Sequence, residues 1–334
     1  MASTAAALNL APDLLSARPS REQRSAASVA NVSEALFKLA PPPANANGRF
    51  APSPTGRLHV GNLRTALVAW CCARSQGADF SLRIEDLDSE RKRDGAAEQQ
   101  LKDLAALGID WDRPVVYQSE RTSSYLAAIE VLRKHDLLYE CWCTRAEIRE
   151  AASAPSGTPV VYPGTCRDLP RAELQARRAI SRTPALRVRA GDQVVRFFDR
   201  AHGDCTGVVD DFVVARQDGT AAYHLAVVID DAELGVGEVV RGDDLLESTP
   251  AQVWLAEQLE LAVPTYAHIP LMRDGAGKPL SKKDGSLTLA GQAANGLDPD
   301  RVRSDLAASL GLCELGEPID IDQLALRFAA TLVD

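Results

Sequence analysis

The sequence predicts an α/β protein with a doubly wound parallel sheet, and three observations support this prediction. Strand and helix patterns alternate from residue 50 to about residue 138, a second alternating stretch runs from about residue 210 to residue 261, and a cysteine-bearing segment separates the two. Such alternation is typical of a parallel sheet covered by helices. In a doubly wound sheet the ligand is expected at the carboxyl ends of the strands, where the strand order reverses.

The first half begins with a short strand that ends at residues 49–51. Pro52 and Pro54 follow, and each fixes φ and holds the preceding residue extended, so a helix cannot start there. Gly56 allows a turn, and residues 62–70 then place apolar side chains at helical spacing. The rest of this half is expected as a strand at residues 80–84 and helices around residues 96–107 and 123–134.

The second half resumes the alternation after the insert. Runs at residues 210–214, 223–227 and 238–242 precede a helix expected around residues 251–261. The chain is therefore expected to divide into a weakly ordered tail at residues 1–47, the first half of the sheet domain at 48–139, the insert at 140–205, the second half at 206–290 and a short helical segment at 291–334.

Length and composition indicate a protein with a sizeable hydrophobic core. The 334 residues are 46% hydrophobic and 25% charged, and no stretch is long and apolar enough to cross a membrane. The net charge of −9 argues against non-specific binding of polyanions, so any contact with nucleic acid must come from local basic patches. The arginine-rich segment at residues 167–189 is one such patch, and a solvated helix face is the equal alternative.

The N-terminal 47 residues are rich in alanine and serine. They lack a basic region followed by an apolar one, so they do not have the pattern of a secretory signal. We therefore expect the protein in the cytoplasm, where its seven cysteines are reduced and form no disulfide framework. Metal binding or burial then explains the cysteines.

Residues 49–61 have the pattern of an anion site, because a strand, a glycine-containing loop and a helix follow one another. His59 lies at the helix start, where its imidazole can donate to phosphate oxygens, and Gly61 lets a ligand approach the backbone. A surface turn with a structural histidine is the alternative. Far along the chain, Lys282 and Lys283 lie in a loop rich in glycine and aspartate. Together the two segments indicate a nucleoside triphosphate site.

The insert carries a second chemical pattern, made of Cys141, Cys143, Tyr162 and Cys166. Three thiols and a phenol in a compact loop can form a tetrahedral zinc site, since thiolates hold zinc without any histidine. The alternative is a set of small buried thiols. No such grouping is evident for the remaining cysteines, which are interpreted as core residues: Cys71, Cys72, Cys205 and Cys313.

Four segments now carry a resemblance to a known family. Residues 49–61 resemble the first signature of the class I aminoacyl-tRNA synthetases of the glutamate and glutamine group, and residues 280–283 resemble their lysine-bearing signature. Residues 82–88 and 223–226 match the same group, and all four occur in the expected order. Each match alone is weak, because short strings recur by chance. The resemblance implies a Rossmann-type core that activates glutamate with ATP and Mg²⁺ through an aminoacyl-adenylate.

The resemblance also implies roles for the residues of the nucleotide site. His59 and Lys282 would stabilise the phosphoryl group during transfer. Gly61, Asn62 and Lys283 would complete the ATP-binding site. Asn62 replaces the second histidine of the usual signature; it can donate a hydrogen bond but cannot carry charge.

For the amino acid, the resemblance implies that Arg49 and Arg241 contact carboxylates, since a guanidinium distinguishes glutamate from glutamine by charge. Glu85 would face the amino group. The remaining implied residues of the glutamate site are Ala51, Ser53 and Tyr223. Without the resemblance, Glu85 would be interpreted as a surface partner of a nearby arginine and Arg241 as a strand-end salt bridge.

About fifty residues follow Lys283, whereas a full glutamyl enzyme would carry a large helical anticodon-reading domain there. This difference implies the truncated branch of the family, which attaches glutamate to queuosine at the wobble position of aspartate tRNA. The cysteine and tyrosine pattern resembles the zinc knuckle of that branch, and Val227 stands where full-length enzymes usually have asparagine. The family resemblance further implies a monomer.

Three hypotheses about function follow. The chain glutamylates tRNA(Asp) that contains queuosine, or it is a shortened synthetase that charges the 3′ end of tRNA(Glu), or it is a non-catalytic paralogue that binds glutamate or nucleotide as a sensor. The presence of His59, Lys282 and the two pocket arginines argues against the last.

Overall fold

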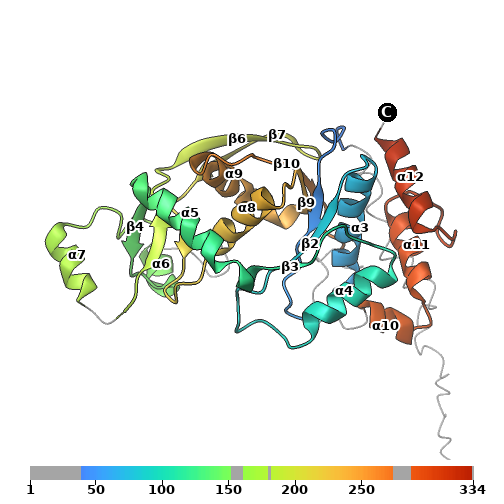
Figure 1. Ribbon diagram of the computed structural model, residues 1–334, viewed down its shortest axis with the longest axis horizontal. Coiled ribbons are helices and arrows are strands. Elements are labelled where there is room, and N and C mark those ends of the chain that lie inside the picture. The colour runs from blue at the N-terminus through green and yellow to red at the C-terminus, as the bar shows by residue number, and fades with distance from the viewer. Residues whose placement is uncertain (1–38, 152–160, 180–181, 274–286, 333–334) are drawn as a thin grey trace, which may run out of the picture.

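Two sheets meet edge to edge at the centre of the molecule (Figure 1). The structure, a computed structural model, describes residues 39–151, 161–179, 182–273 and 287–332. In the first sheet three parallel strands lie in the order β1 (Gly48–Phe50), β2 (Phe80–Ile84) and β3 (Val116–Tyr117).

The second sheet lies in the order β7 (Gly203–Val209), β6 (Gln193–Asp199), β10 (Thr265–Ile269) and β9 (Glu238–Gly242). Strands β6, β10 and β9 are parallel, and β7 pairs antiparallel with β6. The amides of Gly237 and Glu238 both donate to the carbonyl of Asn47, which joins β9 to β1. The order therefore reverses between β1 and β9, and the prediction of an α/β fold with a parallel sheet is confirmed.

Helices cover these sheets, and α3 (Val60–Arg74) is the most central because it packs against both β1 and β9. Its apolar side chains after Val60 are buried, and Leu63 and Leu67 are fully so. The other helices next to these two sheets are α4 (Ala96–Ala106), α5 (Thr122–Lys134), α8 (Tyr223–Glu233) and α9 (Thr249–Gln258), with short 3₁₀ turns η1 (Gln118–Glu120) and η2 (Asp243–Ser248).

The C-terminal segment is helical, with α10 (Leu289–Ala294), α11 (Pro299–Ser309) and α12 (Ile321–Thr331). Figure 1 shows α11 and α12 beside α3 at one end of the molecule. Helix α12 packs on α3 through Leu324 and Phe328, which are both buried. These helices thus extend the core of the first half.

A third, antiparallel sheet lies at the other end of the molecule. It contains β4 (Leu138–Cys141), β5 (Ala185–Val188) and β8 (Val213–Ala215), with α6 (Arg145–Ala151) and α7 (Arg171–Arg178) attached (Figure 1). The segment expected as an insert, residues 140–205, starts inside β4. Its last part belongs elsewhere, because β6 pairs with β10 and therefore joins the second sheet.

The elements expected from periodicity match those observed to within a few residues. Strand β2 has the expected bounds, and α4, α5 and α9 lie where helices were expected. Helix α3 begins two residues before the expected start because His59 caps it. Residues 223–227, which continue the alternating pattern, form the start of α8 rather than a strand.

The described chain begins inside the segment expected as a tail. Leu39 is buried in the core, and the Arg200 side chain and backbone exchange hydrogen bonds with the backbone of Ala40. The packed structure thus starts before residue 48. None of the described helices has the length and apolar character needed to cross a membrane.

Candidate active site

A cavity of about 390 Å³ opens where β1 and β9 lie side by side. Its walls come from the carboxyl ends of β1, β2 and β9 and the amino ends of α3 and α8, which is where doubly wound sheets bind ligands. The structure brings these predicted site residues to the cavity: Arg49, Ala51, Ser53, His59, Gly61, Asn62, Glu85, Tyr223 and Arg241. Lys282 and Lys283 lie outside the described residues.

His59 is the N-cap of α3. Its Nδ1 accepts hydrogen bonds from the amides of Gly61 (3.1 Å) and Asn62 (3.3 Å), and the Asn62 side chain accepts one from the His59 amide. A neutral imidazole that accepts at Nδ1 carries its proton on Nε2. His59 can thus cap the helix through Nδ1 and also donate a hydrogen bond to a phosphate from Nε2. A Cβ on Gly61 would lie 3.0 Å from the ring, so this glycine makes room for His59.

A buried ionic network supports the wall of the cavity beneath Arg49. Asp231 on α8 accepts from Arg83 Nη1 at 2.5 Å and from Arg49 Nε at 3.3 Å. Arg83 is fully buried and also donates to Glu85 at 3.2 Å. The pair expected on the surface as the alternative for Glu85 therefore exists, but it lies inside the cavity wall.

The pKa values of Glu85 and Asp231 are shifted in opposite directions. Burial raises the pKa of Glu85, and the charges of Arg83 and Arg49 offset this only in part. Burial also acts to raise the pKa of Asp231, but Arg83 and Arg49 outweigh it and hold that pKa below its ordinary value. Asp231 is therefore the permanent counter-ion of the two arginines.

Replacing Asp231 with asparagine is expected to lower the free energy of unfolding by about 3 kcal/mol, because two buried guanidinium groups lose their shared counter-ion. Since the folded-state pKa of Asp231 is depressed, its stabilisation is present above about pH 4 and disappears as the pH falls through the folded value. The variant should therefore lose less stability in acid than the wild type. Urea unfolding over a pH series measures both effects.

Glu130→Gln is the matched control for this substitution. Glu130 pairs with Arg133 on the exposed side of α5, and such pairs contribute less than about 1 kcal/mol. Equal unfolding free energies for the two variants would contradict the network described above.

Arg241 on β9 is a buried cation whose described hydrogen-bond acceptors are all neutral. It donates from Nε to His268 Nε2 at 2.9 Å, from Nη1 to Gln252 Oε1 at 2.7 Å and from Nη2 to Thr249 Oγ1 at 2.8 Å. Within the described part of the chain, no carboxylate forms an ion pair with it. Burial lowers the pKa of its guanidinium, which still remains a cation. The strand-end salt bridge considered as an alternative is thus absent from the described residues.

Several residues of the site carry no local sequence signal. Asp244, Leu271 and Met272 line the cavity. Asp231 holds both Arg49 and Arg83, although 182 residues separate Arg49 from Asp231. The sequence offers one hint to Asp244, which is its position: two aspartates follow Arg241 and Gly242 at the end of a strand.

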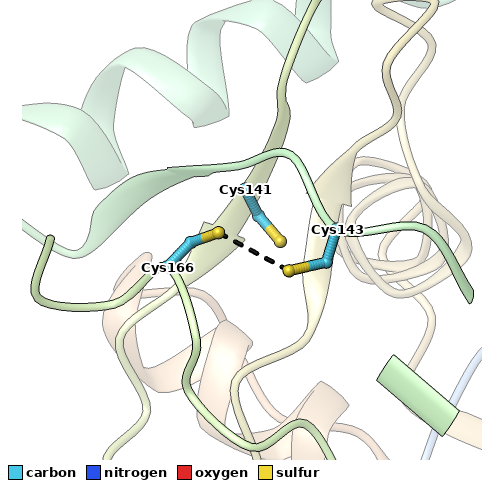
Figure 2. A group of neighbouring side chains, drawn as sticks. All are labelled: Cys141, Cys143 and Cys166. Carbon is cyan, nitrogen blue, oxygen red and sulfur yellow. Dashed lines mark hydrogen bonds between the residues drawn. The ribbon is translucent and has the colours of Figure 1, made fainter. Parts of the chain in front are cut away.

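Figure 2 shows Cys141, Cys143 and Cys166 with their sulfur atoms turned toward one another. The three sulfur atoms lie within 4.8 Å, and the Cys143 and Cys166 atoms are 3.6 Å apart. The Tyr162 hydroxyl lies 3.4 Å from Cys141 Sγ and 3.8 Å from Cys143 Sγ. Ligands on a tetrahedral zinc with Zn–S of about 2.3 Å and Zn–O of about 2.0 Å are separated by about 3.5 to 3.8 Å. The donor set and its spacing can thus hold a metal ion.

The surroundings of the three thiols favour the thiolate form of Cys141 but not that of Cys143. Burial acts to raise the pKa of Cys141, but its hydrogen bonds with Tyr162 and Arg187 and the charge of Arg187 lower it overall. Burial and the neighbouring Cys141 raise the pKa of Cys143 to about 12. Arg187 lies over the Tyr162 ring, 3.9 Å from its centroid, and donates to Cys141 Sγ at 3.3 Å. These contacts offset part of the negative charge that several thiolates would bring together.

The other cysteines do not join this group. Cys71 and Cys72 are buried in α3, as expected, whereas Cys205 and Cys313 are only partly buried.

A second hollow of about 1040 Å³ lies between the antiparallel sheet and the start of α8. Tyr223 lines both this hollow and the first cavity. The lining of the second hollow also includes Arg145, Arg182 and Arg216. The arginine-rich segment next to it is largely neutralised, because its members pair with acids: Arg167 with Asp211, Arg177 with Glu173, Arg178 with Glu140 and Arg189 with Asp168.

Comparison with known proteins places this geometry in context. Residues 46–310 match the family of tRNA synthetases class I (E and Q), catalytic domain. The chain is 56% identical over 265 residues to a glutamyl-Q tRNA(Asp) synthetase of Nocardia farcinica, covering 79% of this chain and 85% of that protein. A protein of the same name from Symbiobacterium thermophilum is 45% identical over 291 residues, with 83% and 90% covered.

Among solved structures, the chain resembles a glutamate tRNA ligase from Elizabethkingia meningosepticum in complex with its amino acid. The TM-score is 0.72 at 28% identity. The match covers 84% of this chain and 64% of that one, so the chain spans less than two thirds of that ligase.

Proposed function

The chain belongs to the class I tRNA synthetases for glutamate and glutamine, and from this membership we propose that it activates L-glutamate with ATP and transfers it to queuosine in tRNA(Asp). The activation step proceeds without tRNA in this proposal. The chain's high identity to two proteins named glutamyl-Q tRNA(Asp) synthetase supports it over the other hypotheses.

The environment of Arg241 is the main support for glutamate as the substrate. Arg241 is a desolvated cation in the wall of the cavity, and the acceptors described around it are neutral. A carboxylate of glutamate would supply the missing counter-charge, whereas the amide of glutamine would not. Glu85 lines the same cavity and would face the ammonium group, while Arg49 would contact a carboxylate from the end of β1.

The chemistry follows from this placement. An oxygen of the glutamate α-carboxylate attacks the α-phosphorus of ATP, the bond to the β-phosphate oxygen breaks, and pyrophosphate leaves. His59, through Nε2–H, and Lys282 would stabilise the phosphoryl group, with Gly61, Asn62 and Lys283 holding the nucleotide. Mg²⁺ would enter with the ATP phosphates and neutralise their charge. No protein nucleophile takes part.

Transfer then requires the acceptor to reach the adenylate. A hydroxyl of the queuosine cyclopentenediol attacks the glutamyl carbonyl, AMP leaves, and the hydroxyl proton is lost. The second hollow suits this approach, because Tyr223 lines both it and the first cavity, and its lining includes Arg145, Arg182 and Arg216, which can contact phosphates. A hypermodified base splayed out of an anticodon loop could enter such a hollow.

We further propose that Cys141, Cys143, Cys166 and Tyr162 bind one structural zinc ion. The spacing of the four ligand atoms supports this assignment, as does the pair of arginines beside the sulfur atoms. The metal would tie β4 to the loop before α7 and so brace the sheet that borders the second hollow.

Transfer of labelled glutamate tests the function. The protein, ATP and Mg²⁺ are incubated with two tRNA pools that differ only in whether queuosine is present, and labelled tRNA is separated by identity. We expect label on tRNA(Asp) from the queuosine pool and none on the other, because a site built for the diol rejects a base that lacks it.

Label on tRNA(Glu) from both pools would instead support a shortened synthetase that charges the 3′ end, which the likeness to a glutamate tRNA ligase keeps as the second candidate. Glutamate-dependent pyrophosphate exchange without any tRNA separates the two further. Binding of glutamate without exchange would support the sensor hypothesis and overturn the proposal.

A further inference from the structure

Three buried side chains form a chain of hydrogen bonds that leads away from the cavity. Arg241 on β9 donates to His268 Nε2 on β10 at 2.9 Å, and His268 Nδ1 lies 2.6 Å from Asp199 Oδ2 at the end of β6. His268 and Asp199 are fully buried. Since β9, β10 and β6 are neighbours in one sheet, these hydrogen bonds cross three adjacent strands.

The chemistry of arginine fixes the direction of these bonds. A guanidinium can only donate, so His268 Nε2 accepts and the imidazole proton resides on Nδ1, where it donates to Asp199. Asp199 is held in turn by the backbone amides of Ala201, His202 and His268 itself. Burial, together with the nearby Arg241 charge, lowers the pKa of His268 and keeps the ring neutral, although Asp199 acts in the opposite direction. The imidazole of His268 thus has a single tautomer, with its proton on Nδ1.

The remaining hydrogens of Arg241 are nearly all used. Of its five N–H groups, one donates to His268, and three others donate to Gln252, Thr249 and the Leu245 carbonyl. That leaves one hydrogen on Nη1 for a ligand. The plane of the guanidinium is therefore defined by the protein before any substrate arrives.

We propose that Asp199 and His268 are positioning residues that aim Arg241 at the substrate carboxylate while leaving its charge uncompensated; this inference rests on the proposed function. An aspartate in direct contact with Arg241 would orient it equally well but would neutralise it and compete with glutamate. The neutral imidazole of His268, which Asp199 orients, instead accepts the hydrogen bond from Arg241 at Nε2 and places no negative charge beside the guanidinium. The arrangement therefore selects for a carboxylate ligand.

Asp199→Asn tests the proposal kinetically. The amide N–H of asparagine would face Nδ1 and drive the imidazole proton to Nε2, where it opposes the Arg241 donor. We expect the KM for glutamate in pyrophosphate exchange to rise about 10- to 100-fold, the range lost with a hydrogen bond to a charged group. The KM for ATP should not change. Asp204→Asn, on the exposed face of the same hairpin, is the control and should leave both constants unaltered.

Two substitutions of His268 separate positioning from structural support. His268→Gln keeps an oxygen that can accept from Arg241 and an amide that can donate to Asp199, so it should recover most of the affinity for glutamate. His268→Leu offers neither group and should raise the KM as Asp199→Asn does. Equal effects of the two variants, or a common loss of affinity for glutamate and ATP, would overturn the proposal.

The tautomer can be measured without any activity. Long-range ¹H–¹⁵N correlation spectra of histidine-labelled protein, with His268 assigned by its Gln variant, should show Nδ1 protonated in the wild type and Nε2 protonated in Asp199→Asn. Protonation at Nε2 in the wild type would refute the hydrogen-bond chain. If the tautomer is as described but glutamate does not bind, the proposed function fails instead, and the kinetic and spectroscopic outcomes distinguish the two.

Discussion

Replacing Arg241 with leucine is expected to remove glutamate activation while the protein stays folded. Truncating one partner of a buried, hydrogen-bonded charge pair loses about 2 to 5 kcal/mol of binding, so kcat/KM for glutamate should fall by about 30- to 5,000-fold. The fold should survive because the described partners of Arg241 are neutral, and leucine therefore strands no buried charge. Pyrophosphate exchange measures the loss, and circular dichroism checks the fold.

Two further variants sharpen this prediction. Arg241→Lys keeps the charge but loses the planar fork, so it should retain part of the activity and discriminate less well between glutamate and glutamine. Arg196→Leu is the control, since Arg196 is exposed on β6 and is not among the residues that line the cavity. Unchanged exchange in Arg241→Leu would mean that another residue recognises the carboxylate.

Removing zinc is expected to produce the largest loss of stability. The purified protein should contain one zinc per chain, and chelation or Cys166→Ser should lower the melting temperature and disorder the sheet of β4, β5 and β8. Structural zinc in small peptides contributes about 10 kcal/mol or more, and here the loss should be several kcal/mol because the sheet also buries Val188, Val214 and Ala215 in a core that it shares with α5 and α8. Metal analysis and thermal unfolding measure the two effects.

Cys205→Ser provides the control for the thiol itself, because Cys205 lies on β7, outside the metal-binding group. Tyr162→Phe examines the fourth ligand and should weaken zinc binding without abolishing it, since three thiolates remain. Full zinc content in Cys166→Ser, or no zinc in the wild type, would contradict the zinc site and support the alternative that these are buried thiols.

Much of the cavity could be predicted because its residues lie in short, continuous motifs. Residues 49–61 contain the strand end, the turn and the helix cap, so the local sequence already determines that His59 precedes a helix. Its role as the cap itself was missed, because only the structure shows Nδ1 turned to the amides of Gly61 and Asn62.

The residues that support the cavity could not be predicted in the same way. Asp231, Asp199 and His268 lie within α8, β6 and β10, and no motif distinguishes them from the other positions of these elements. Their roles depend on which strands become neighbours. The lysine signature at Lys282 and Lys283 falls outside the described residues, so its role stays a prediction.

The sequence by itself determined the class of fold, the family and the order of the motifs, because periodicity and short motifs are local properties of the chain. Only the tertiary structure decided that residues 49–53, 58, 59, 61, 85, 223 and 241 line one cavity, since the reversal of strand order between β1 and β9 brings them together. It also decided the charge of the site. Arg241, which without the resemblance would be interpreted as a strand-end salt bridge, is buried among neutral acceptors, and burial makes its charge available to a ligand.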